Sequence, residues 1–132
     1  MKIGAHVSTA GGIGNAVARG QDIGCEAIQI FGSSPQTWTV KSVPGEQIEL
    51  FRQGLADAGM GPVFLHAIYL INLGTTNKEN LHKSIGSLIS YMDLAANIGA
   101  GGVIVHPGSH GGRGFEKVLP QVVEAIKIVL DA

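Results

Sequence analysis

The stretch GGVIVHPGSH, residues 101–110, contains a short β-branched run that ends on a histidine and then breaks at a proline and a glycine. The letters VIV favour a buried strand, and the PG pair after the histidine favours a turn. A polar side chain at the carboxyl end of a parallel strand lies at the sheet edge where α/β proteins bind ligands. His106 is therefore the first candidate site residue.

The same succession of a β-rich run, a turn and a helical stretch occurs four times along the chain. The expected strands are KIGAHVS (2–8), AIQIF (27–31), PVFLHA (62–67) and GGVIVH (101–106). The expected helices cover about 13–24, 46–58, 78–98 and 115–130. This alternation predicts an α/β fold in which four βα units build a parallel sheet.

The helix ends carry recognisable signals. Asn77 or Thr76 can cap the long third helix, and Glu79 lies favourably in its first turn. Pro120 falls within the fourth helical stretch. The proline lies close enough to the start of this helix to be tolerated if the helix proper begins near Leu119.

The composition limits the class of protein. Of the 132 residues, 45% are apolar and 14% charged, and the formal net charge is −1. These values predict one soluble globular domain over residues 1–132, without the broad basic field that announces a nucleic-acid partner. The sequence has no apolar run of about 18 residues and no signal-peptide pattern at its start, so we expect no membrane association. With Cys25 as the single cysteine, we expect a reducing, cytoplasmic compartment.

Two architectures can hold four βα units. An open doubly wound sheet would be complete at this length, whereas a (β/α)8 barrel of about 250 residues would be half present. Length favours the open sheet. The polar and aromatic residues at the expected strand ends suit both architectures, because both place ligands at that edge; these residues are His6, Phe31, His66 and His106.

The histidines allow two interpretations. His66 and His106 end two expected strands, so their imidazoles can meet as ligands for zinc, manganese or iron. A catalytic zinc site uses about three protein ligands, so the pair is incomplete. Alternatively, each ring is a core histidine bonded to a backbone carbonyl. We expect His6 to support such a site or to pack beside it.

Two loops offer groups that can bind a polar ligand. The loop GSHGGRG, residues 108–114, presents backbone N–H groups, Ser109, His110 and Arg113 ahead of a helix, which predicts an anion cradle. It lacks the spacing of a phosphate-binding P-loop, so ATP binding is not predicted. Tyr69 and Trp38 lie in loops after strands, where an aromatic ring either stacks on a base or packs beneath its loop.

Three motifs together resemble the N-terminal part of the endonuclease IV family of apurinic/apyrimidinic endonucleases. They are MKIGAHVSTAGG (1–12), HAIYLINLG (66–74) and HPGSH (106–110), they follow the family's order, and the resemblance runs from Met1 to the last helix. It implies a (β/α)8 TIM barrel of the xylose isomerase-like type, of which this chain supplies about the first four βα units. It also implies zinc-assisted hydrolysis of double-stranded DNA on the 5′ side of an abasic site, with three zinc ions, as in DNA base excision repair.

The resemblance extends to individual residues. His66 and His106 match two histidines that bind one zinc, and Tyr69 matches an aromatic residue that enters the DNA near the lesion. The segment FGSSPQTW, residues 31–38, matches a DNA-recognition loop, although Gln36 stands where arginine is frequent and so removes a cation. The expected DNA-contacting residues are Tyr69, Ser34, Gln36, Trp38, Ser109 and His110.

The family's remaining zinc ligands lie on later strands than the four expected here. Two histidines cannot hold a three-metal cluster, so we expect weak or absent nuclease activity from the 132-residue chain. One alternative is a non-catalytic half-barrel that self-associates through its open sheet edges. Another is a metal-dependent sugar isomerase or epimerase of the same superfamily, which the motifs YLINLG and HPGSH disfavour.

Overall fold

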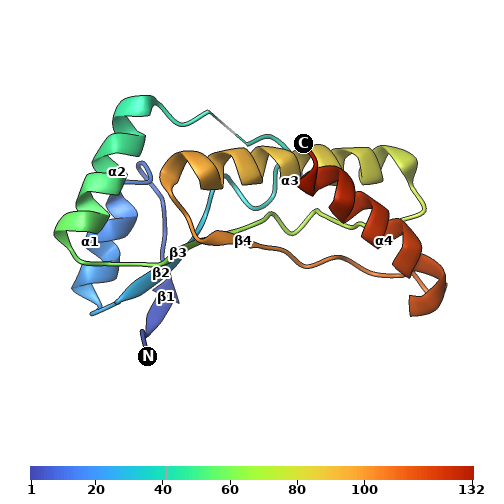
Figure 1. The fold of residues 1–132 in the computed structure, drawn as a ribbon, viewed down its shortest axis with the longest axis horizontal. Helices are drawn as coiled ribbons and strands as arrows, with labels where there is room; N and C mark the ends of the chain where they lie inside the picture. Colours follow the sequence, from blue (N-terminus) through green and yellow to red (C-terminus); the bar gives the residue numbers. More distant parts are fainter. Residues whose placement is uncertain (41) are drawn as a thin grey trace.

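Four strands alternate with four helices in the computed structural model, which describes residues 1–40 and 42–132 (Figure 1). The predicted alternation is therefore confirmed. In chain order the elements are β1 (Gly4–His6), α1 (Asn15–Asp22), β2 (Ala27–Phe31), α2 (Gly45–Asp57), β3 (Val63–His66), α3 (Lys78–Ile98), β4 (Gly102–Ile104) and α4 (Phe115–Leu130).

The strand order separates the two architectures. All three strand pairs are parallel, and the order in the sheet is β1-β2-β3-β4. A doubly wound sheet reverses its strand order at a switch point, which this sheet does not do. Successive right-handed crossovers between neighbouring strands place the helices on one face, as in a barrel. The winding therefore contradicts the open doubly wound sheet that length favoured.

The core lies between the strands and the helices. In β2 the residues alternate, with Ile28 and Ile30 buried and their neighbours only half-buried, and Val63 and Leu65 continue this buried face in β3. Phe51 of α2 is also fully buried in this cluster. Each such side chain contributes about 2 kcal/mol by leaving water. The helices therefore cover one face of the sheet and leave the other more open.

The long helix has the predicted ends. α3 runs from Lys78 to Ile98, and the Asn77 side chain caps it by accepting a hydrogen bond from the backbone N–H of Asn80 at 3.0 Å. Gly99 ends it with a positive φ of 71°, which glycine adopts without a steric cost.

β1, β3 and β4 are shorter than predicted, whereas the bounds of the last helix agree with the prediction. α4 runs from Phe115 to Leu130 and contains Pro120, as predicted, although the proline lies beyond its first turn. The proline removes only the backbone bond toward the carbonyl of Glu116, and both residues are exposed, so water can satisfy that carbonyl. β4 ends at Ile104, and His106 therefore follows the strand by two residues instead of ending it.

The outer surfaces of the fold are less completely covered. β1 and β4 are the two edge strands, and α4 packs against α3 (Figure 1). α4 also exposes an apolar stripe, defined here by Phe115, Leu119, Val123, Ile126 and Leu130. None of the helices in the described part of the chain is both long and apolar enough to span a membrane.

Candidate functional site

The carboxyl ends of the strands bring five aromatic or imidazole rings together. We call them the histidine cluster, and its members are His6, Phe31, His66, Tyr69 and His106. Parallel pairing sets Phe31 of β2 opposite His66 of β3. The ring centre of His66 lies 5.3 Å from that of Phe31, 5.5 Å from that of Tyr69 and 5.2 Å from that of His106. His66 is therefore the centre of the cluster.

The hydrogen bond of His66 sets its tautomer. The side chain is only 8% exposed, and its Nδ1 lies 2.7 Å from the carbonyl oxygen of Ala67. Because a carbonyl only accepts, Nδ1 donates and the lone pair of the neutral ring is on Nε2. A backbone carbonyl on the other ring nitrogen is the usual support of a metal-binding histidine. The carbonyl-bonded core histidine and the metal ligand are thus compatible interpretations of His66.

The distance between His66 and His106 fits a shared ion. A zinc ion bound tetrahedrally to two imidazoles through bonds of about 2 Å holds their ring centres roughly 5 Å apart, and the distance here is 5.2 Å. His106 is exposed, so its ring is open to a ligand. Over residues 1–40 and 42–132, no group of three or more histidine, cysteine, aspartate or glutamate side chains can hold a metal. The arrangement therefore offers a pair of ligands.

His6 has the opposite hydrogen-bonding pattern. The Nε2 amide of Gln29 donates to Nδ1 of His6 at 2.7 Å, so the neutral ring of His6 carries its proton on Nε2. Partial burial lowers the pKa of His6, and the nearby His66 lowers it further. The accepting Nδ1 and protonated Nε2 of the neutral ring suit the predicted role of His6 beside His66 and His106.

The Tyr69 ring packs against the ring of Phe31, and most of the residue is exposed to solvent. Its ring centre lies 5.6 Å from that of Phe31 in an edge-on arrangement, yet 64% of the residue is exposed. A ring supported in this way can stack on a base or enter a gap in a duplex. Trp38 differs, because it is half-buried and packs against the hydrophobic core, which leaves less of its ring for a ligand.

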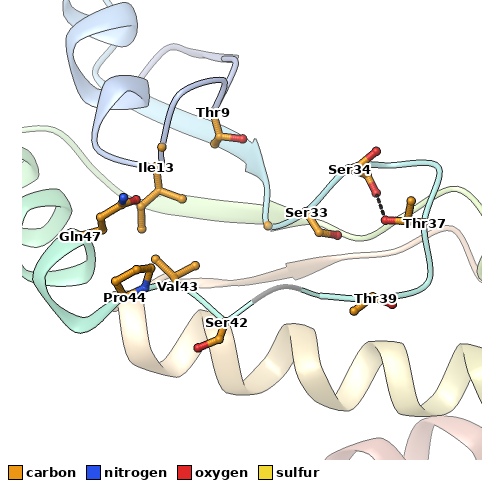
Figure 2. Close-up of a pocket in the computed structure, with 12 residues that line it drawn as sticks. Thr9, Ile13, Ser33, Ser34, Thr37, Thr39, Ser42, Val43, Pro44 and Gln47 are labelled. Carbon is orange, nitrogen blue, oxygen red and sulfur yellow. Dashed lines mark hydrogen bonds between the residues drawn. The ribbon is translucent and has the colours of Figure 1, made fainter.

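A pocket of about 410 Å³ is lined by residues of the loop after β1, the segment after β2 and the start of α2. Figure 2 shows side chains that line it, among them Thr9, Ser33, Ser34, Thr37 and Gln47. The hydroxyl of Thr37 donates to the carbonyl of Ser34 at 3.3 Å. A neighbouring hollow of about 450 Å³ shares Thr9, Ser33 and Ser34 and reaches His6. Ser34 thus lies between the pocket and the histidine cluster, whereas Gln36 is exposed on the same loop.

Ser109 and His110 shape the loop after β4. The backbone N–H groups of Gly112 and Gly114 donate to Nδ1 of His110 at 3.1 and 3.3 Å, and that of Gly111 donates to Oγ of Ser109 at 3.1 Å. The neutral His110 ring therefore carries its proton on Nε2, where it can donate to an anion. These two side chains hold the turn ahead of α4.

Arg113 is partly engaged within the protein. Its Nη2 donates to the carbonyl of Gly74, and the residue is half-buried. Arg113 was expected to line an anion cradle. Part of its guanidinium instead joins the loop after β4 to the loop after β3.

One residue without a role in the sequence interpretation has several contacts near the site. Oδ1 of Asn72 accepts from the backbone N–H of Gly74 at 3.0 Å and from that of Ser109 at 3.1 Å. The second bond spans 37 residues and joins the loop after β3 to the loop after β4. The sequence shows Asn72 within the motif YLINLG and Gly108 within the motif HPGSH. Neither motif indicates that Asn72 and Gly108 lie close together in the fold.

Comparison with known proteins gives consistent results at the level of sequence. A family model described as "Xylose isomerase-like TIM barrel" matches residues 17–132. "Probable endonuclease 4" of Geobacter sp. (strain M21) is 43% identical over 123 residues, which cover 93% of this chain and 44% of that protein. The protein of the same name from Halothermothrix orenii is 38% identical over 129 residues, 98% of this chain and 46% of that protein. The chain spans about half the length of the curated relatives it matches.

The comparison with solved structures agrees with the sequence comparison. Endonuclease IV from Thermus thermophilus superposes with a TM-score of 0.88 at 34% identity, over 99% of this chain and 46% of that one. A 3-keto-D-glucoside 4-epimerase from E. coli superposes with a TM-score of 0.67 at 12% identity, over 98% of this chain and 51% of that one. The second likeness shows a shared fold alone.

Proposed function

The chain belongs to the xylose isomerase-like TIM barrel family, and we propose that it functions in DNA repair as part of an endonuclease of the endonuclease 4 type. The reaction we propose is hydrolysis of the phosphodiester on the 5′ side of an abasic site in double-stranded DNA. The observation that carries the proposal is the His66–His106 pair, 5.2 Å apart between ring centres, with an exposed Tyr69 against it. Similarity to proteins named endonuclease 4 supports the same reaction class.

The proposed metal is zinc, held by His66 through Nε2 and by the His106 ring. The hydrogen bond from Nδ1–H of His66 to the carbonyl of Ala67 supports this assignment, because it fixes the ring and leaves the lone pair of Nε2 for the metal. When bound, zinc would supply Lewis-acid stabilisation of a phosphate and activation of a water. His6, kept neutral beside the pair, would add no positive charge to repel the cation.

The proposed DNA surface consists of the loops around the histidine cluster. Tyr69 would stack within the duplex at the lesion, since its ring is exposed and its position is fixed by Phe31 and His66. The remaining proposed contacts are polar or lie at loop surfaces, and they come from Ser34, Gln36, Trp38, Ser109 and His110. Hydroxyl, amide and imidazole donors of this kind position the phosphate backbone without reading base sequence.

We further propose that the 132-residue chain incises weakly or not at all by itself. The described residues provide a pair of imidazoles and no group of three or more metal-binding side chains, whereas hydrolysis of this class uses a fuller set of ligands. The DNA substrate and the single thiol of Cys25 favour the cytoplasm as the compartment. A sugar epimerase activity is not proposed, because the epimerase likeness at 12% identity supports only the fold.

DNA binding tests the proposed substrate. Fluorescence anisotropy should show that the chain binds a duplex with one synthetic abasic site more tightly than the intact duplex. Tyr69→Ala should reduce binding to the abasic duplex by about tenfold, since base stacking on an aromatic side chain has this magnitude. Tyr69→Phe is the matched control and should retain the preference, because it keeps the ring. Equal binding of the two duplexes by the unmodified chain would contradict the proposed lesion recognition.

Incision of the same abasic duplex in the presence of zinc tests the chemistry. We expect little or no product from the 132-residue chain. Efficient incision that disappears in His106→Ala would support the nuclease assignment and overturn the expected weakness. Efficient incision that persists in His106→Ala would overturn the assignment of the zinc ligand.

A further inference from the structure

We propose that Asn72 is a positioning residue that fastens the loop carrying Tyr69 to the loop carrying His106, so that both loops form one rigid part of the site. The role of those two loops in DNA cleavage rests on the proposed function. The fastening itself rests on hydrogen bonds and close approaches between the loops. The experiments below distinguish the two.

The Asn72 side chain bridges the loops through its amide oxygen. Oδ1 accepts from Gly74 N–H within its own loop and from Ser109 N–H in the loop after β4, at 3.0 and 3.1 Å. The backbone N–H of Asn72 donates to Oγ of Ser84 at 3.1 Å, and Ser84 is completely buried in α3. The bridge is therefore anchored to the core at one end.

Other hydrogen bonds reinforce the same connection. The backbone N–H of Leu73 donates to the carbonyl of Pro107 at 2.8 Å. Nε2 of Gln121, on α4, donates to the carbonyls of Leu73 and Thr75 at 2.7 and 2.9 Å. Arg113 also donates to the carbonyl of Gly74. The loop after β3 is thus bonded both to the loop after β4 and to the helix that follows it.

Two glycines let the loops approach closely. A Cβ at Gly108 would lie 2.2 Å from Oδ1 and 2.6 Å from Cα of Asn72. A Cβ at Gly74 would lie 2.8 Å from the carbonyl oxygen of Ser109. Because no side chain fits at either position without movement, the contact between the loops depends on glycine.

The loop after β2 is attached differently. Oγ of Ser33 lies 3.0 Å from the hydroxyl of Tyr91 on α3. Among residues 1–40 and 42–132, no hydrogen bond joins the segment 32–44 to the loop after β3 or to the loop after β4. The edge of the site therefore has a fastened part that carries Tyr69 and His106 and a separate part that carries Ser34 and Gln36.

The hydrogen bonds between the two loops restrain the position of His106 relative to His66. His66 belongs to β3, whereas His106 lies beyond the end of β4 and next to Pro107, whose carbonyl receives the Leu73 bond. Tyr69 lies three residues before Asn72, and its ring centre is 6.4 Å from that of His106. Loosening the bridge should therefore let the His106 ring move relative to both Tyr69 and His66.

Amide hydrogen exchange measured by NMR tests the bridge without any ligand. In Asn72→Ala we expect the amides of Gly74 and Ser109 to exchange about tenfold faster, the factor that corresponds to losing a hydrogen bond of ~1.4 kcal/mol. Asn72→Asp retains an acceptor oxygen at the same place and should keep both rates near those of the unmodified chain. Unchanged rates at Gly74 and Ser109 in Asn72→Ala would overturn the proposal.

A second variant keeps the test valid if Asn72→Ala fails to fold. Gly108→Ala retains the asparagine but forces the loops apart, so the same two amides should exchange faster. Gly111→Ala is the matched control. Gly111 has a positive φ, as Gly108 has, but a Cβ at Gly111 meets no atom within 4 Å. Equal effects of the two glycine substitutions on Gly74 and Ser109 would overturn the proposal.

The positioning role needs a readout at the histidines. Titration of the chain with zinc alone, followed by the ring signals of His66 and His106, should show an affinity about tenfold lower in Asn72→Ala and restored in Asn72→Asp, as for other groups that orient metal ligands. Faster exchange with unchanged zinc affinity would overturn the positioning role. No zinc binding by the unmodified chain, with Asn72-dependent exchange, would instead contradict the proposed metal site and support the bridge.

Discussion

At the scale of single residues, two histidines of the same cluster have opposite tautomers. Nδ1 of His66 donates to the carbonyl of Ala67, whereas Nδ1 of His6 accepts from the amide of Gln29. The neutral His66 ring therefore presents a lone pair at Nε2, and the neutral His6 ring presents a proton there. This difference supports His66 as the metal ligand and His6 as its neighbour.

The sequence predicted the type of these residues but not their hydrogen bonds. His66 and His106 could be selected because each follows an apolar run. Whether an imidazole donates or accepts at Nδ1 depends on which group of another strand or turn faces it. Gln29, 23 residues from His6, is such a group.

Tyr91 provides a pH prediction at this scale. It is completely buried, and burial raises the pKa of its phenol above the ordinary value of 10.0, although hydrogen bonds from Ser33 and Gly32 oppose the shift. Because the folded pKa is raised, the stability that neutral Tyr91 contributes is fully present below pH 10 and is lost as the pH rises through the folded pKa.

Ultraviolet titration of a Tyr69→Phe variant should isolate this group, since Tyr69 and Tyr91 are the only tyrosines of the sequence. We expect the ionisation of Tyr91 to have its midpoint above 10.0, and the free energy of unfolding to fall as that ionisation proceeds. A midpoint at or below this ordinary value would contradict the effect of burial.

At the scale of elements, regular hydrophobic patterns were sufficient for the central strand and the longest helix. AIQIF was predicted as residues 27–31 and forms β2 over the same residues, while α3 begins and ends as predicted. α4 also has its predicted bounds, and its proline is tolerated because it is exposed and costs one backbone bond. β4 is shorter than predicted, since its pairing with β3 ends before His106.

The N-terminus of α3 provides a prediction at this scale. Replacing Asn77 by alanine removes the acceptor for the backbone N–H of Asn80, and we expect a loss of about 1 kcal/mol in the free energy of unfolding. Urea denaturation measures this loss. Asn77→Asp keeps an oxygen acceptor at the cap and should change the midpoint little. An equal loss in both variants would show that the cap bond is not the cause.

At the scale of the whole molecule, the sequential order of the strands leaves β1 and β4 as edges. The apolar stripe of α4 has spacings of three and four residues, so its side chains lie along one exposed side of the helix. Unpaired edges and an exposed apolar stripe both promote association. These features support the expectation from the sequence that a half-barrel self-associates.

Sedimentation velocity should therefore show that the 132-residue chain forms dimers or larger species as its concentration rises. The double variant Leu119→Glu and Val123→Glu places two charges on the stripe and should shift the equilibrium to the monomer. Ala96→Glu adds a charge at an exposed position of α3 and should leave the association unchanged. A chain that remains monomeric at every concentration would contradict self-association through these surfaces.

The succession of elements, the buried faces of the strands and the candidate histidines can be derived from the sequence, because they depend on local periodicity and residue chemistry. The winding of the sheet, the tautomers of His6 and His66, and the bridge from Asn72 to Ser109 become visible only in the folded chain. The winding, the His6 bond and the Asn72 bridge each depend on a short distance between groups far apart in the chain, and the His66 bond depends on the backbone conformation at the end of β3. Folding of the intervening residues sets such a distance, and no local pattern encodes it.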